Sequence, residues 1–547
     1  MKKRFVFMAA IAGIFAAIAV SCASTKAAPT LPDNDIVILY TNDVHCGLDD
    51  NIGYAGLSLY KKEMKEVTPY VSLVDAGDAI QGSPVGSISE GGYIIEIMNA
   101  LGYEVAVPGN HEYDYGMKRF NEIAKALSCG YISCNARDEK GKLIFPAYKI
   151  LSYGKTKVAF VGVSTPENIT KSTPGIFKNT DGKFIYSFGG ENKGEAMFAD
   201  VQNAINEARK KGADYVILLA HLGEKNVTPE WSAESVVANT TGADVLIDGH
   251  SHEITPGLVV NNKEGKPVTI TQTGTKLNNI GKLTIAKDGA ISVELINSVP
   301  QKDGVSVDME IKNMIDSINE KFAAYLGKKV GESDFSLVAT DENGKWLVRN
   351  RETNLSDFVA DAFRSAYKTD ISLVNGGGIR KTVKAGDITY GDVFSLQPFG
   401  NRLCVCEISG QALLDELEFG IRLYPQMCGG MLQVSGVTYK VNANIPSSVK
   451  TDENSFFTGV VEGEYRVRDV MVNGEPLDLN KTYTVAGTAY VLRENGDGHK
   501  FEGLKALPRD EYMYDRDAVA AYFESFSGKI PESYRNENGQ GRIVFEQ

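Results

Sequence analysis

Histidines and acidic or amide side chains recur directly behind short apolar runs in this chain of 547 residues. Five of the six histidines stand in such places, together with two aspartates and one asparagine. In chain order these residues are Asp43, His45, Asp78, Asn110, His111, His221, His250 and His252. Imidazole, carboxylate and carboxamide groups together suit divalent zinc, manganese or iron. One such place alone would be a weak signal, but five of them indicate a metal centre.

The elements that must position these groups are the strands of a buried sheet. Apolar runs predict strands at 36–41, 71–75, 104–107, 157–163, 215–220 and 244–248. Amphipathic stretches between them, such as 93–101 and 196–211, predict helices. This alternation favours an α/β fold, in which ligands gather at the carboxyl ends of the strands. The ligand candidates are too many for one tetrahedral ion, so we expect two ions with Asp78 as the bridge.

The second half of the chain has its own pattern. Residues 308–326 predict one helix, because apolar residues recur there at three- and four-residue steps, and we expect this helix to connect two domains. A second α/β region follows from about residue 330 and contains the turn "NGGGIR" at 375–380. This turn lacks the glycine spacing of a P-loop. Its glycines would still let backbone approach a ligand, with Arg380 placed for a carboxylate or phosphate.

The charge of the chain limits its partners. A formal net charge of −13 argues against a general nucleic-acid binder, which needs a basic surface for phosphates. A small anionic substrate is compatible with this charge, provided that metals or a few arginines supply local positive charge. Nothing in the sequence decides between a monomer and a dimer.

The first residues predict a targeting segment. Residues 1–22 combine a basic start with an apolar run from Phe5 to Val20, which is too short to span a membrane. The segment resembles a bacterial lipoprotein signal that ends at a lipidated Cys22, and an ordinary cleaved signal peptide is the alternative. Both predict an exported protein, periplasmic or on the cell surface. Residues 23–35 would form a flexible linker.

Export permits disulfides among the other cysteines, which are Cys46, Cys129, Cys134, Cys404, Cys406 and Cys428. Cys129 and Cys134 are the best local candidates for a pair. We expect most of the others to be free and buried. Cys404 and Cys406 lie on an apparent strand, and we expect them on opposite faces of it.

In combination, these motifs resemble the calcineurin-type metallophosphoesterases. The segments "TNDVH", "DAGDAIQGSP" and "GNHEYDYG" are similar, more narrowly, to the 5′-nucleotidase family of bacteria and animals, over nearly all of the chain after residue 35. The resemblance implies an N-terminal four-layer α/β sandwich metallophosphoesterase domain at 36–302. A linker helix within 303–330 and a C-terminal α/β nucleotide-binding domain at 331–547 would follow.

The resemblance also implies roles for the polar groups. One metal would be held by Asp43, His45 and His252, the other by Asn110, His221 and His250, with Asp78 between them. The ions would be two divalent metals, zinc or manganese. His111 would contact substrate, and Asp114 would fix its tautomer and favour the imidazolium, which stabilises charge on the phosphoryl oxygens. Glu112 would be structural, and Cys46 either alters the metal preference or is a bystander.

The nucleotide pocket implied by the resemblance lies in the C-terminal region. Its residues would be Arg349, Asn375, Arg380, Phe399, Asn401, Tyr490 and Asp497. The arginines would bind phosphate, two aromatic rings would sandwich the base, and the aspartate would take the ribose hydroxyls. The family's second ring usually stands six residues before that aspartate, where this chain has Val491. Adjacent Tyr490 is the alternative after a shift of one residue.

These observations favour an exported two-metal 5′-nucleotidase. It would release phosphate from nucleoside 5′-monophosphates by in-line attack of a metal-bound hydroxide. A hydrolase of nucleotide sugars or 2′,3′-cyclic nucleotides is one alternative, and a relative acting on sulfur-linked sulfate is a second. A surface lipoprotein that binds nucleotides without turnover is a third. The family resemblance implies a rotation between the domains, although a rigid arrangement is also compatible with the sequence.

Overall fold

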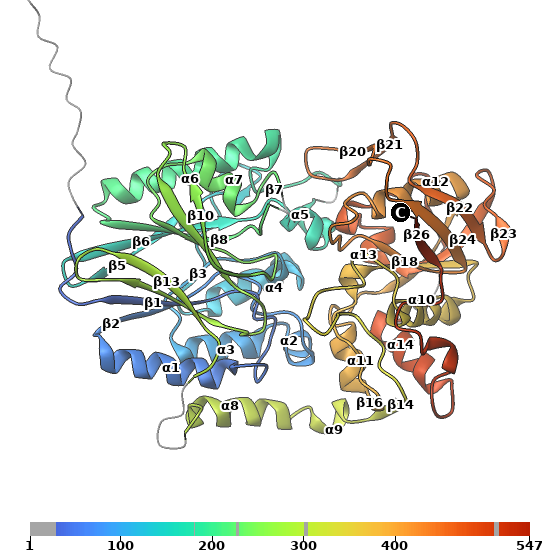
Figure 1. Cartoon of the computed structure of the whole chain (residues 1–547), viewed down its shortest axis with the longest axis horizontal. Coiled ribbons are helices and arrows are strands. Elements are labelled where there is room, and N and C mark those ends of the chain that lie inside the picture. The colour runs from blue at the N-terminus through green and yellow to red at the C-terminus, as the bar shows by residue number, and fades with distance from the viewer. Residues whose placement is uncertain (1–28, 180, 226–228, 300–304, 508–512, 547) are drawn as a thin grey trace, which may run out of the picture.

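The structure of the protein is a computed structural model that describes residues 29–179, 181–225, 229–299, 305–507 and 513–546 (Figure 1). The predicted targeting segment at 1–22 lies outside the described residues, as do residues 23–28 of the predicted linker at 23–35. Among the described residues, no helix has the length and apolar character needed to cross a membrane. We call the part up to residue 299 the N-terminal half and the part from residue 329 the C-terminal half.

Two sheets pack face to face in the N-terminal half. The first has the order β13-β12-β1-β2-β3 and the second the order β10-β11-β9-β8-β6-β5. Their bounds are β1 Ile36–Thr41, β2 Tyr70–Asp75, β3 Val105–Ala106, β5 Tyr148–Tyr153, β6 Thr156–Ser164, β8 Tyr215–His221, β9 Val245–Ile247, β10 Ile254–Asn261, β11 Pro267–Thr273, β12 Ile280–Ile285 and β13 Ile291–Ile296. The strand predicted at 104–107 is thus shorter than expected.

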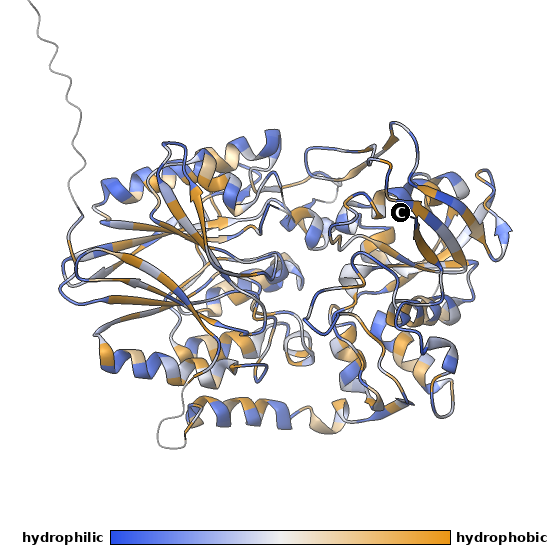
Figure 2. Ribbon diagram, viewed as in Figure 1, coloured by the Kyte–Doolittle hydropathy of each residue, from blue (hydrophilic) through white to orange (hydrophobic). Residues whose placement is uncertain are grey.

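The strand β1 shows why these sheets are buried on both faces. Ile36, Ile38 and Tyr40 belong to the core between the two sheets, whereas Val37 and Leu39 belong to the core under the outer helices. Successive side chains of a strand point to opposite faces, so a continuous apolar run fills both layers. Figure 2 shows the apolar residues concentrated on these strands.

Helices cover the outer face of each sheet (Figure 1). The first sheet carries α1 (Gly53–Val67), α3 (Gly92–Leu101) and α4 (Gly116–Ala126), and the second carries α6 (Glu191–Lys210) and α7 (Ala233–Asn239). The result is a helix–sheet–sheet–helix arrangement. The prediction of a four-layer α/β sandwich is therefore confirmed.

The predicted single helix at 308–326 is wrong in one respect, because it is two helices, α8 (Met309–Glu320) and α9 (Ala323–Leu326). Helix α8 buries Ile315 and Ile318 against α1 and α3. Beyond it, Phe322 packs on Tyr93 of the N-terminal half, while Tyr325 packs on Tyr390 of the C-terminal half. The segment breaks because its two ends pack on different surfaces.

The C-terminal half is also α/β. Its main sheet has the order β18-β15-β24-β17-β25, and a second sheet has the order β23-β22-β19-β26. The main bounds are β15 Ile371–Asn375, β17 Leu403–Ser409, β18 Leu432–Ser435, β19 Val437–Asn442, β22 Val467–Val472, β23 Glu475–Pro476, β24 Thr482–Thr488, β25 Lys505–Ala506, β26 Ile543–Glu546, α10 Asn354–Tyr367, α11 Tyr390–Leu396, α12 Gly410–Gly420 and α14 Asp515–Glu524. Val374 and Leu373 of β15 face two different cores, so this sheet is covered on both faces as well.

The cysteines correct two expectations. All six of those in the described residues are free, so the suggested pair of Cys129 and Cys134 is wrong. Cys404 and Cys406 point to the same side of β17, with their sulfur atoms 4.0 Å apart. The expectation of opposite faces was wrong because residues two apart on a strand share a face.

Candidate active site

The turns behind β1, β2 and β9 converge at one edge of the two sheets. Five of the metal-ligand candidates there adopt left-handed backbone conformations, namely Asp43, His45, Asp78, His250 and His252, and the neighbouring Cys46 does so as well. Left-handed conformations are uncommon for residues other than glycine, although Asp and His adopt them more readily than most, and they cluster at functional sites. The turns thus hold their side chains in positions that an unstrained backbone would not provide.

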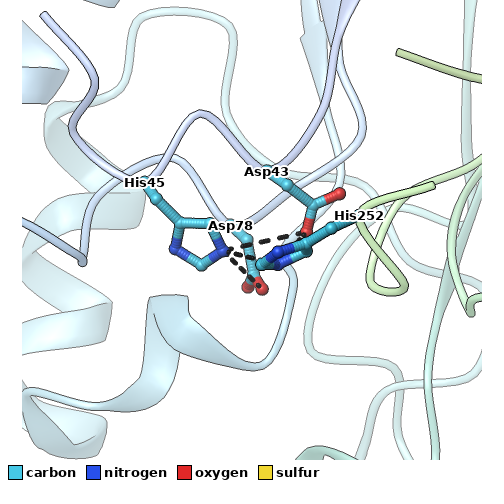
Figure 3. Close-up of side chains that lie close together, drawn as sticks. All are labelled: Asp43, His45, Asp78 and His252. Carbon is cyan, nitrogen blue, oxygen red and sulfur yellow. Dashed lines mark hydrogen bonds and ion pairs between the residues drawn. The ribbon is translucent and has the colours of Figure 1, made fainter. Parts of the chain in front are cut away.

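Asp43, His45, Asp78 and His252 form the first of two metal-sized clusters (Figure 3). Nε2 of His45 lies 3.0 Å from Nε2 of His252, and 3.9 Å from an oxygen of Asp43. Two lone pairs would repel at this distance, but ligands of one ion lie about 3 Å apart because metal–nitrogen bonds are about 2 Å long. Burial lowers the pKa of both rings, which favours the neutral form that binds metal.

The second cluster consists of Asp78, His221 and His250, and Asn110 lines the same cavity. Nδ1 of His221 donates to the carbonyl oxygen of Ala76 at 2.7 Å, so Nε2 is the nitrogen that the neutral ring would offer to a metal. This Nε2 lies 3.2 Å from a carboxylate oxygen of Asp78, and Oδ1 of Asn110 is buried without a hydrogen-bond partner among the described residues. Buried acceptors without a donor fit a cation, and Asp78 belongs to both clusters. The donor set therefore fits two divalent ions.

Glu167 is a member of the site that the sequence analysis missed. One of its carboxylate oxygens lies 2.7 Å from Nε2 of His250, which leaves Nδ1 of that ring to face the second cluster. Carboxylates commonly hold the outer nitrogen of a metal-binding histidine in this way. The available signal was its position, because Glu167 follows the end of β6 at the same edge of the sheets.

The polar side chains of the segment from Gly109 to Asp114 make different contacts. Nδ1 of His111 lies 2.6 Å from the carboxylate of Asp114. Burial lowers the pKa of His111, but Asp114 and Asp78 together outweigh it and the pKa is raised, which favours the imidazolium. Glu112 accepts hydrogen bonds from the backbone N–H groups of Gly109, Asp78 and Ala79, at 2.6–2.8 Å. Glu112 thus joins two turns.

A cavity next to the metal clusters is lined by both halves of the chain. The predicted residues Arg349, Asn375, Arg380, Phe399, Asn401, Tyr490 and Asp497 line it, together with His111, Asp114 and several of the metal-ligand candidates. Burial, and then the charge of Arg380, lower the pKa of Arg349 to about 9. Arg349 and Arg380 are both partly exposed, and two guanidinium groups that line one cavity provide a strong attraction for an anion.

The structure also distinguishes Tyr490 from Val491. Tyr490 lines the cavity, whereas the Val491 side chain is fully buried in the core of the C-terminal half. The hydroxyl of Tyr490 donates to the carbonyl oxygen of Thr170 at 3.0 Å and accepts from the N–H of Asp497 at 3.0 Å. Phe399 lines the cavity as well, and its ring lies 5.4 Å from the His111 ring. Arg351, by contrast, is exposed and does not line the cavity.

Comparison with known proteins agrees with this geometry. Residues 36–253 match the family model of calcineurin-like phosphoesterases, and residues 330–506 match that of the 5′-nucleotidase C-terminal domain. The chain belongs to the 5′-nucleotidase family. The matched models are thus those of a calcineurin-like phosphoesterase and of the C-terminal domain of 5′-nucleotidases, and the donor set of the site could hold divalent ions.

Relatives of this 5′-nucleotidase family member match over most of its length. A 5′-nucleotidase of Vibrio parahaemolyticus is 26% identical and is aligned over 95% of this chain and 100% of its own. The 5′-nucleotidase of Bos taurus is 25% identical, over 93% of this chain and 91% of its own. A trifunctional nucleotide phosphoesterase of Bacillus subtilis is 27% identical over 85% of this chain. The chain spans only 32% of that protein's length.

Solved structures show the same fold for this family member. The crystal structure of a 5′-nucleotidase precursor from Thermus thermophilus covers 93% of this chain and 99% of its own, with a TM-score of 0.76 and 24% identity. A sulfate thiohydrolase from the same organism covers 94% and 97%, with a TM-score of 0.70 and 17% identity. The fold therefore serves more than one hydrolysis. Substrate class has to be argued from the side chains of this chain.

Proposed function

We propose that this chain is an exported dinuclear phosphohydrolase that releases phosphate from nucleoside 5′-monophosphates. The observation that supports this most is the shared cavity, which is lined by metal-ligand candidates, His111, three arginines (Arg349, Arg380 and Arg422) and the aromatic rings Phe399 and Tyr490. A nucleotide has a matching sequence of groups, namely phosphate, sugar and base. Export would depend on the segment at 1–22, with a lipid anchor at Cys22. The domains would span 36–302 and 331–547, with the connector at 303–330.

The chemistry follows from the groups that face the cavity. Two zinc or manganese ions, when bound by Asp43, His45, Asp78, Asn110, His221, His250 and His252, would activate water and polarise the phosphoryl group. The His111 imidazolium, held by Asp114, stabilises the charge that grows on the phosphoryl oxygens. Arg349 and Arg380 attract the phosphate, and Phe399 and Tyr490 stack on the base. Base stacking of this kind contributes about 1–3 kcal/mol and tolerates any base.

The test is phosphate release from AMP, GMP, CMP, UMP, ATP, UDP-glucose, 2′,3′-cyclic AMP and a plain sugar phosphate. Each substrate is offered to metal-stripped protein and again after addition of manganese or zinc. We expect metal-dependent release from the four monophosphates and little from the sugar phosphate, which cannot stack. In His111→Ala, which is expected to keep its metals, release should fall by about 100-fold or more.

Other outcomes identify the alternatives. Faster release from UDP-glucose or from cyclic AMP than from AMP would indicate a hydrolase of those substrates. Tight binding of AMP without turnover, in protein that has both metals, would indicate a nucleotide-binding protein. If no compound of the panel is hydrolysed and none binds, the proposal of a nucleotide substrate is contradicted.

A further inference from the structure

A lysine of the N-terminal half reaches into the nucleotide-binding residues of the C-terminal half. Nζ of Lys171, at the end of α5 (Asn168–Lys171), lies 3.0 Å from a carboxylate oxygen of Asp497, in the turn η4 (Gly496–Gly498). The side chain of Lys171 is 24% exposed and that of Asp497 is 5% exposed. Both line the cavity described above. The sequence places these two residues more than 300 positions apart, and neither half alone contains this pair.

The surroundings hold both partners in place. The second carboxylate oxygen of Asp497 accepts from the side-chain amide of Asn375 at 2.8 Å. Beside the ion pair, the Tyr490 hydroxyl joins the N–H of Asp497 to the carbonyl oxygen of Thr170, which is the neighbour of Lys171. Burial lowers the pKa of Lys171, but Asp497 and Glu167 outweigh it and the pKa is raised, so the side chain is an ammonium.

The remaining hydrogen-bonding capacity of this pair faces the cavity. An ammonium has three N–H donors and a carboxylate has about four acceptor positions. Within the described residues, Asp497 is the acceptor within hydrogen-bond distance of Lys171, and Asp497 receives Asn375 and Lys171 on its side chain. The pair therefore presents both donors and acceptors to a ligand. A hydroxyl group, which donates and accepts, is the neutral group that satisfies both.

We propose that Lys171 is a specificity-determining residue that donates a hydrogen bond to a ribose hydroxyl oxygen, while Asp497 accepts a hydrogen bond from a ribose hydroxyl. This inference rests on the proposed nucleotide substrate. The pair lines the same cavity as the phosphate-attracting arginines and Tyr490, and the sugar of a nucleotide has to lie between its phosphate and its base. Because the ammonium belongs to the half that carries the metals, the sugar is recognised only when the two halves are together.

The test compares AMP with 2′,3′-dideoxy-AMP as substrates of the full chain with metals. Lys171→Met should lower kcat/KM for AMP about tenfold and leave the dideoxy substrate within about twofold, because only AMP offers the hydroxyls. Lys171→Arg, which keeps the charge, should recover most of the activity on AMP. A double-mutant cycle with Asp497→Asn then shows whether Lys171 acts on the sugar itself or only by holding Asp497 in place. If Lys171 touches the sugar, Lys171→Met lowers AMP turnover further in that background.

Lys178→Met is the matched control. Lys178 also joins the two halves, since its ammonium lies 4.6 Å from the Phe184 ring and 5.9 Å from the Phe456 ring of the C-terminal half, but it does not line the cavity. Its removal should affect AMP and the dideoxy substrate by the same factor. This control measures the cost of weakening the contact between the halves without changing the sugar site.

Several results would overturn the proposal. An equal loss on both substrates in Lys171→Met would make Lys171 a structural contact between the halves, and no loss on AMP would also refute it. So would the absence of any further loss in the Asp497→Asn background. Wild-type protein that releases no phosphate from AMP would instead refute the proposed function. In that case, the affinities of wild type and Lys171→Met for adenosine and 2′,3′-dideoxyadenosine test the role of Lys171 by itself. If wild type does not prefer adenosine, or if Lys171→Met keeps the same preference, the proposal for Lys171 fails too.

Discussion

The carboxylate of Asp114 lies 2.6 Å from Nδ1 of His111, and this contact governs how the ring can act at a phosphoryl group. In Asp114→Asn the amide keeps the shape of the side chain but removes the negative charge that favours the imidazolium. We expect kcat for AMP to fall about 10- to 100-fold with little change in KM or metal content. Steady-state kinetics with metal analysis of the same sample checks this. A kcat within twofold of wild type would mean that His111 does not depend on Asp114.

Glu167 holds the ring of His250 through one carboxylate oxygen. In Glu167→Gln the ring loses a charged partner, so we expect the affinity for one of the two ions to fall about 10- to 100-fold, with the fold intact. Titration of metal-stripped protein with manganese measures this directly, without reference to turnover. Glu230→Gln is a suitable control, because Glu230 is a surface residue paired with Lys193. Two unchanged binding steps in Glu167→Gln would refute the assigned role.

At the scale of elements, the turns behind the strands cross each other so closely that one glycine is required. A Cβ atom on Gly109 would lie 2.3 Å from a carboxylate oxygen of Asp78 and 2.8 Å from the ring of His221. Gly116, which closes the same segment, has φ +82° and open space around it. Gly109 is thus required because a side chain would collide with Asp78 and His221, whereas Gly116 is favoured only by its left-handed backbone conformation.

We therefore expect Gly109→Ala to displace Asp78 and to abolish the binding of both ions, because Asp78 belongs to both clusters. Gly116→Ala should cost only about 1 kcal/mol for the left-handed backbone and leave metal binding unchanged. Metal titration and thermal unfolding of the two variants check this pair of expectations. Retention of both ions by Gly109→Ala would show that the turns have more freedom than the distances indicate.

The elements that could be predicted from the sequence are those whose signal is local. The strands were found because apolar runs bounded by polar turns are short-range patterns, and the metal-ligand candidates followed because each stands directly behind such a run. The break at Phe322 was missed, since it depends on contacts with Tyr93 and Tyr390, far away in the sequence. Lys171 was missed for the same reason, because its partner Asp497 belongs to the other half.

At the scale of the whole molecule, the candidate site is divided between two halves that meet through a small number of specific contacts. The N-terminal half supplies the metal-ligand candidates, and the C-terminal half supplies the arginines and aromatic rings. The connector α8–α9 runs along one side of both halves (Figure 1). Sequence reasoning could assign residues to each half from motifs. It could not derive which side chains meet across the cavity, because that depends on how the halves are oriented.

The stability of the C-terminal half should depend on pH through a buried pair of carboxyl groups. Glu352 and Asp357 accept backbone N–H groups near the end of the chain, from Gln540 to both and from Ile543 to Glu352. Burial, only partly opposed by Arg542 and reinforced by Glu352, raises the pKa of Asp357 to about 9. This pKa lies above that of Asp357 in the unfolded chain, so the protonated carboxyl group stabilises the folded state. Its contribution to the free energy of unfolding is complete below about pH 4 and is lost as the pH rises towards 9.

The prediction is that Asp357→Asn removes part of this pH dependence. Asparagine keeps an acceptor for the backbone of Gln540 and stays neutral at every pH, so it avoids the ionised buried form that wild type adopts in alkali. Between about pH 5 and pH 9, we expect the free energy of unfolding of wild type to fall by about 1–3 kcal/mol more than that of the variant. This difference corresponds to several degrees in the melting temperature of that half. Thermal unfolding of both proteins across this range measures the difference. Parallel curves would mean that Asp357 ionises in the folded protein at its ordinary pKa.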